Sequence, residues 1–241
     1  DGRAMYAPAY ITDHRTPFAV RWGGWYVTGS HRFERHLGNA TATGLDDIAT
    51  MVTPETLHVD RLDGRFEMRG YPSPWSDIVA LMVLEHQARM GSLITRTGWD
   101  ARLGAQASRP MTQNVAELVD YMLFVDEAPL PAPVTGPSRF TETFSARGPH
   151  DSQGRSLYQL ALDSRLMKYP CSFMIYSEPF DALPDDVKQA IYTRLWEILS
   201  GKERSPRYDR LTAADRRAIV EILAETKADL PHEFYAYVAG P

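Results

Sequence analysis

The stretch SDIVALMVLEHQARMGSLI, residues 76–94, decides the fold class of this chain. Its apolar residues repeat at the three- and four-residue spacing that places them on one buried face of a helix. They are Val79, Met82, Val83, Met90, Leu93 and Ile94, with His86 among them. Ser76 is a typical N-cap residue, and Asp77 falls in the first turn, where the helix dipole favours a carboxylate. The pattern predicts a helix of about five turns that begins after Ser76.

Four further helices are predicted downstream of this stretch. Amphipathic patterns place two of them at 111–125 and 155–168. A third begins at Pro184 and ends at an expected glycine cap, Gly201, and a fourth begins at the capping-box run 212–215. Prolines at 129, 131, 133 and 137 predict a long surface connection over 129–150. Residues 171–180 are apolar and aromatic, and they fit either a helix or a buried strand.

The front of the chain has a different character. Residues 1–72 are rich in glycine and turn residues, with short β-type runs at 25–28 and 56–59. We therefore predict one mainly α domain over residues 1–241, with a loop-rich part carrying a small N-terminal β element at 1–72 and a helical part at 73–241.

Composition excludes several classes of protein. The chain has 26 Lys plus Arg against 31 Asp plus Glu, a net charge of −5, which excludes a strongly cationic nucleic-acid binder. Hydrophobic residues at 44% and charged residues at 24% are ordinary globular usage. We see no apolar run long enough for a transmembrane segment and no start of signal-peptide type. The first methionine is Met5, and we expect the chain to be part of a longer polypeptide.

His86 is the sharpest chemical signal in the sequence. A histidine on an apolar helical face must find a hydrogen-bond partner or give a nitrogen to a metal or cofactor. Met90 lies one turn away on the same face, so both side chains fit contact with a haem or a soft metal. A hydrogen-bonded core histidine beside a packing methionine is the alternative, and the sequence leaves both open.

A second polar cluster follows the glycine- and tryptophan-rich run 22–26. Arg35 and His36, with His31 and Arg32, fit either a carboxylate-binding group such as a haem propionate partner or an ordinary solvated loop. The pair Asp13-His14 resembles part of a catalytic triad in composition, but no nucleophile elbow completes it. The single cysteine, Cys171, excludes a CxxCH haem-attachment motif and predicts a buried thiol.

The chain resembles the carboxy-terminal part of a group of uncharacterised bacterial exported proteins described as cytochrome c domain-containing. The runs that carry the resemblance are DHRTP at 13–17, RWGGWYVTG at 21–29, RHLGN at 35–39, SDIVALMVLEHQ at 76–87 and YPCSFMIYSE at 169–178. The run LTAADRR at 211–217 also resembles the closing helix of c-type cytochromes.

The resemblance implies a periplasmic or otherwise exported location and a c-type haem whose attachment site lies upstream of the segment that corresponds to Asp13. It implies His36, His86 and Met90 as distal ligands or pocket contacts, with His86 as the metal ligand, and Arg35 as a propionate partner. The leading hypothesis is therefore the helical part of an exported haem c protein in electron transfer or a related redox step, working with a haem-bearing segment or subunit and a redox partner protein. The alternative is a haem-free binding or assembly subunit that docks on a larger complex. A metal-dependent hydrolase lacks the HExxH spacing that would support it.

Overall fold

The computed structural model describes residues 12–40 and 57–239, and its longest element is helix α2, Ile78–Leu103. Asp77 caps this helix, because its side chain accepts hydrogen bonds from the backbone N–H groups of Val79 and Ala80. The predicted helix is thus confirmed, but Asp77 takes the capping role expected of Ser76. Gly104, in the left-handed region at φ 55°, ends α2 after 26 residues, longer than predicted.

The other helices pack against α2 or against each other. They are α3 (Met111–Met122), α4 (Phe140–Ser145), α5 (Glu178–Asp181), α6 (Asp185–Leu199), α7 (Ala213–Thr226) and α8 (His232–Ala239). Short 3-10 turns lie at η1 (Phe18–Val20), η3 (Gly104–Gln106), η4 (Phe173–Tyr176) and η5 (Pro206–Tyr208). The chain is mainly helical, as predicted.

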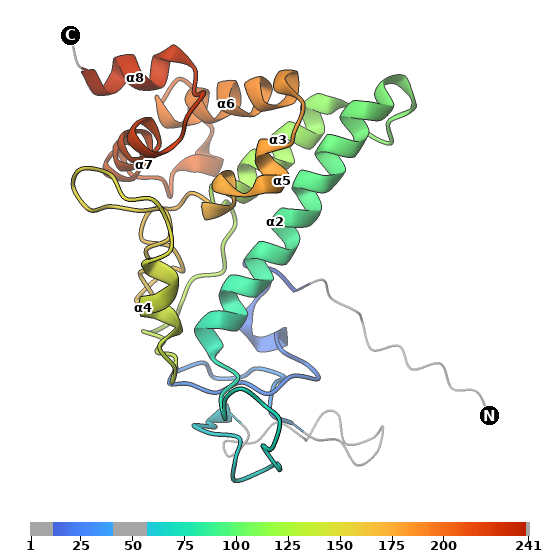
Figure 1. Ribbon diagram of the computed structural model, residues 1–241, viewed down its shortest axis with the longest axis vertical. Helices are drawn as coiled ribbons and strands as arrows, with labels where there is room; N and C mark the ends of the chain where they lie inside the picture. Colours follow the sequence, from blue (N-terminus) through green and yellow to red (C-terminus); the bar gives the residue numbers. More distant parts are fainter. Residues whose placement is uncertain (1–11, 41–56, 240–241) are drawn as a thin grey trace.

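Figure 1 shows how these elements are arranged around α2. The helix runs through most of the molecule, with α3 beside its carboxy-terminal half and the loops before residue 40 near its amino-terminal half. Helix α6 packs on α3, and α7 and α8 pack together beyond it. Buried apolar residues form one cluster that extends from Phe18 to Phe234. None of the helices in the described part of the chain is long and apolar enough to cross a membrane.

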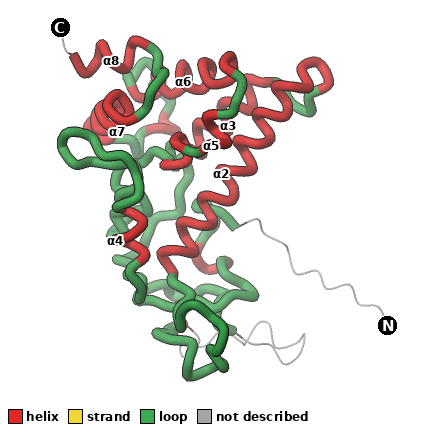
Figure 2. The backbone as a smooth tube through the Cα atoms, viewed as in Figure 1, coloured by secondary structure: helices red, strands yellow, loops and turns green. Residues whose placement is uncertain are grey.

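The predicted N-terminal β element is not borne out. Figure 2 draws no strand within the described ranges, and the run 25–28 is irregular. Single bridges join Thr28 to Asp77 and Ser30 to Thr135, so this loop pairs with the start of α2 and with the 129–150 connection instead of with itself. The second predicted run, 56–59, begins at residue 56, which lies outside the described residues.

The predicted helix at 155–168 is wrong. Residues 159–162 fold back on 165–168, with a bridge between Leu160 and Met167 and a backbone hydrogen bond from Leu162 to the carbonyl of Arg165. Leu162 adopts φ 62°, a left-handed conformation that no helix interior contains. The apolar spacing that predicted a helix instead places Leu157 and Leu166 in the core.

Two other predictions are corrected in detail. The 129–150 connection is not only surface, because it contains α4 and buries Leu130, Val134 and Phe144. Residues 171–180 form η4 and α5, so the helical alternative holds. The capping box at Thr212 is confirmed, with Asp215 as the reciprocal partner.

Candidate functional site

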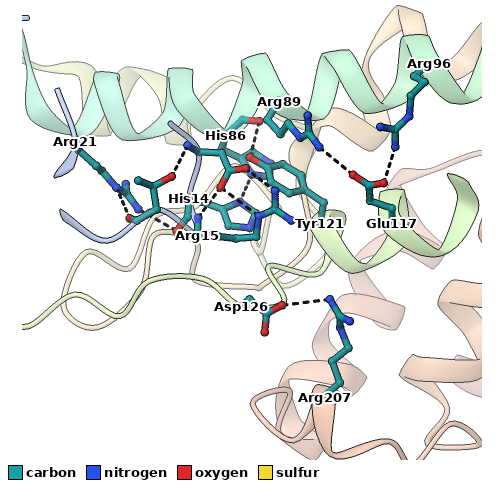
Figure 3. Close-up of polar contacts among 12 residues, drawn as sticks. His14, Arg15, Arg21, His86, Arg89, Arg96, Glu117, Tyr121, Asp126 and Arg207 are labelled. Atoms are coloured by element: carbon teal, nitrogen blue, oxygen red, sulfur yellow. Dashed lines mark hydrogen bonds and ion pairs between the residues drawn. The ribbon is translucent and has the colours of Figure 1, made fainter. Parts of the chain in front are cut away.

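A hydrogen-bonded chain of three buried side chains lies at the centre of the molecule. His86, from the middle of α2, meets the loop residue His14 through a 2.8 Å contact between their Nδ1 atoms (Figure 3). Its other ring nitrogen, Nε2, lies 2.7 Å from the hydroxyl of Ser172, the residue that caps η4. The chain therefore joins three segments that are 72 and 86 residues apart in sequence.

The hydrogen bonds among His14, His86 and Ser172 allow two tautomeric arrangements, which differ in which atoms carry the protons. One of the two Nδ1 atoms must donate and the other must accept. When His86 donates to His14, its Nε2 accepts from the Ser172 hydroxyl, whose oxygen also accepts from the backbone N–H of Met174. When His14 donates, His86 donates to Ser172 instead. In both arrangements every nitrogen of the His86 ring is bonded.

Aromatic rings enclose the pair and keep it uncharged. His14 stacks on Tyr121 and Phe124, with centroids 4.1 and 4.7 Å away, and His86 stacks on Phe124 at 4.3 Å. Burial lowers the pKa of His86 to about 3. Burial, and then the charge of His86, lowers the pKa of His14 well below its usual value, while the backbone of Val125 acts in the opposite sense. Both imidazoles are neutral at physiological pH.

Arg21 fixes the loop that carries His14. Its guanidinium is almost fully buried, and it donates to the backbone carbonyls of Thr16 and His14 and to the carboxylate of Glu85 at 3.0 Å. Burial raises the pKa of Glu85 to about 7 even though Arg21 opposes the shift. Because Glu85 precedes His86 on α2, Arg21 sets the position of one histidine relative to the other.

The order hydroxyl, imidazole, imidazole has the distances of a nucleophile, a base and an orienting group. A substrate cannot reach these groups in this conformation, because the side chains of Ser172 and His86 have no solvent exposure. Neither the cavity beside Phe124 and Arg210 nor the open groove beside Trp75 and Leu84 is lined by these three residues. The arrangement acts as a buried crosslink in this conformation.

Two of the residues that the sequence assigned to a haem, His86 and Met90, are enclosed by protein atoms in this structure. Both nitrogens of His86 are bonded inside the protein, and Met90 is fully buried. The one open imidazole nitrogen of the pair, Nε2 of His14, is buried without a hydrogen-bond partner in the described part of the chain. No group of three or more metal-binding side chains gathers among residues 12–40 and 57–239.

Arg35 and His36 lie in a different environment from His86. The ring of His36 bonds through Nε2 to the carbonyl of Leu57 and through Nδ1 to the backbone N–H of Gly38, and it packs edge-on against Trp22. Arg35 is exposed. The structure therefore places Met90 on the same helix as His86, as predicted, but His36 and Arg35 make no contact with that pair among the described interactions.

His14 and Ser172 are the site residues that the sequence did not single out. The sequence marks His14 only as part of the pair Asp13-His14, and Ser172 only as a member of the run 169–178. Both lie in runs that carry the family resemblance, 13–17 and 169–178, and His86 lies in a third, 76–87. That coincidence was the available signal, but nothing local in the sequence sets a spacing of 72 or 86 residues.

An open groove lies at the amino-terminal end of α2. It encloses about 330 Å³ between residues 73–84 and 138–140. The apolar side chains that line it are Trp75, Ala80, Leu81, Leu84 and Phe140. Leu84 is 51% exposed, and the polar residues along the same groove are Ser73, Ser76, Ser138 and Asp77, whose carboxylate accepts from the hydroxyl of Ser138.

Comparison with known proteins finds no matching family model, no similar curated protein and no similar solved structure. The resemblance to cytochrome c domain-containing proteins stays a prediction from the sequence.

Proposed function

We propose that this chain is a haem-free binding domain that docks on a larger complex through the groove at the start of α2. The groove carries the proposal: partly exposed apolar side chains surround an open volume of about 330 Å³ there, with hydroxyl groups beside them. A surface of this composition suits an apolar segment of a protein partner with a polar rim.

The buried histidine pair supports the haem-free half of the proposal. A histidine that ligates iron needs a free ring nitrogen facing the metal, and His86 has none. Ligation of iron through either nitrogen of His86 would break one of these two buried hydrogen bonds. The role that the geometry favours for His86 is therefore to hold the loop at 13–21 and the turn at 171–173 against α2.

The partner that we propose is a haem-bearing segment or subunit in an exported complex. Its support is the sequence resemblance, in which the haem-attachment motif lies upstream of the segment that corresponds to Asp13. In this reading the chain contributes the docking surface, and electron transfer belongs to the partner.

The docking surface is tested in the full-length native protein by placing a photocrosslinking amino acid at Leu84, with Thr95 as the matched position. Both residues are exposed on α2, but Thr95 is not among the groove residues. Crosslinks from position 84 to a haem-bearing peptide, with none from position 95, would support the proposal. Equal crosslinking from both positions, or crosslinks only to residues 1–241, would overturn it.

The haem-free role is tested by absorbance spectra of the same full-length protein with His86→Gln. The expected Soret and α bands are unchanged, because the iron ligands lie outside this chain, while thermal unfolding confirms that the variant is folded. A shifted Soret band in the folded variant would return His86 to the role of ligand.

A further inference from the structure

Three arginine side chains converge on a single carboxylate between α2 and α3. Arg89 and Arg96 on α2 donate to Glu117 on α3 at 2.9 and 2.7 Å, as Figure 3 shows. Arg109, from the loop that joins the two helices, donates to the same carboxylate at 2.5 Å. Three positive charges therefore meet one negative charge, in a chain whose net charge is negative.

Nearby acidic groups do not balance the excess positive charge of the three arginines. Asp13 pairs with Arg15, which lies over the ring of Tyr121. Asp100, one turn beyond Arg96, is buried and accepts from Asn114 and from Ser108. Neither carboxylate lies within ion-pair distance of the three arginines.

The guanidinium groups keep unused donors. Each uses one terminal nitrogen on Glu117, and the other terminal nitrogen of each has no hydrogen-bond partner within the described ranges. The Nε atoms of Arg89 and Arg96 are also buried without partners. Burial raises the pKa of Glu117, but hydrogen bonds from Arg109 and Arg96 outweigh it, so the carboxylate stays charged.

We propose that this arginine cluster, defined as Arg89, Arg96 and Arg109 around Glu117, is a binding site for a phosphate group. The three side chains are between a fifth and two-fifths exposed, so a small ligand reaches them from solvent. A dianion carries the charge needed to balance the excess, and guanidinium groups bind phosphate oxygens through paired hydrogen bonds. The site is independent of the groove and of the partner proposed above.

A phosphate fits the cluster better than a second carboxylate does. The planar carboxylate of Glu117 already lies between the arginines. Both of its oxygens accept hydrogen bonds from one terminal nitrogen of each guanidinium group. The remaining donors belong to three separate guanidinium groups, and a tetrahedral group presents oxygens in three directions.

The test is an isothermal calorimetric titration of the intact chain with inorganic phosphate at constant low ionic strength, which measures the affinity for phosphate. Arg96→Gln should weaken binding by about tenfold, because one charged donor is lost. Glu117→Gln should strengthen it by a similar factor, because the competing carboxylate is removed. Arg61→Gln is the matched control, since Arg61 pairs with Asp63 on the open surface away from the cluster, and it should bind as the unchanged chain does.

Phenyl phosphate and malonate distinguish the source of the anion. Phenyl phosphate that competes with inorganic phosphate would indicate a phosphate monoester as the natural ligand, and phosphate that binds more tightly would indicate the free ion. Malonate that binds more tightly than either would overturn the choice of ligand class. Equal affinity of Arg96→Gln and the unchanged chain, both folded by circular dichroism, would show that the cluster only links α2 to α3.

Discussion

Replacing Ser172 by alanine tests whether the histidine chain stabilises the fold. The change removes one oxygen that serves two partners: Nε2 of His86 at 2.7 Å and the backbone N–H of Met174 at 3.2 Å. An unpaired polar atom at a site without solvent access costs about 1–3 kcal/mol, and the loss of an N-cap side chain costs about 0.5–2 kcal/mol. We therefore expect the free energy of unfolding to fall by about 2–4 kcal/mol.

The matched control is Ser156→Ala. Ser156 is equally buried, but within residues 12–40 and 57–239 its hydroxyl accepts only from the backbone N–H of Tyr158. Its loss should cost about 1 kcal/mol. Urea unfolding followed by tryptophan fluorescence measures both, and the comparison is valid where the slope m is unchanged. If the two variants lose the same free energy, the bond from Ser172 to His86 contributes nothing and the crosslink reasoning fails.

Three further results are expected. Burial lowers the pKa of His86 to about 3, below its unfolded value of about 6.5, so the unfolded chain binds more protons between these two pH values. The free energy of unfolding should therefore fall as the pH decreases from about 6.5 towards 3, which urea titrations and the chemical shifts of the His86 ring measure. Glu85→Leu removes the acceptor of the buried Arg21 guanidinium in either protonation state and should cost about 3 kcal/mol in the same urea assay. Gly29→Ala places a Cβ at 2.6 Å from Ile78 and at a φ of 141°, and should lower the thermal midpoint strongly.

Each of these expectations has a control or a contradicting result. A His86 ring that titrates near pH 6.5 would refute the first. Asp63→Asn breaks an exposed ion pair and should leave the urea midpoint unchanged, so an equal effect would refute the second. Gly64→Ala meets no atom within 4 Å, and a matching loss of stability there would refute the third.

The helices that the sequence predicted correctly are those whose signals are local. The apolar face of α2 and the capping box of α7 depend on residues three or four positions apart. Both features are present in the structure. The segment 155–168 had similar apolar spacing but lacked a cap. There the carboxylate of Asp151 accepts from the backbone N–H groups of Gln153 and Arg155, which favours a turn over a helix start.

The candidate site was predictable only in its central residue. His86 is marked by its place on an apolar face, which is a property of one helix. Its partners arrive from segments far away in the chain, and their approach depends on how Arg21 orders the loop and how η4 packs on α2. Such positions follow from tertiary packing, and a single sequence holds no spacing rule for them.

The wide sequence separation of His14, His86 and Ser172 has a consequence for how the molecule assembles. Closing two loops of this length costs entropy before the hydrogen bonds form, so we expect the three side chains to meet late in folding. A nascent chain still on the ribosome, with residues beyond 170 unsynthesised, would lack the hydroxyl and leave the two imidazoles without their anchor. The complete His14–His86–Ser172 contact therefore forms only once the chain has been synthesised past residue 172.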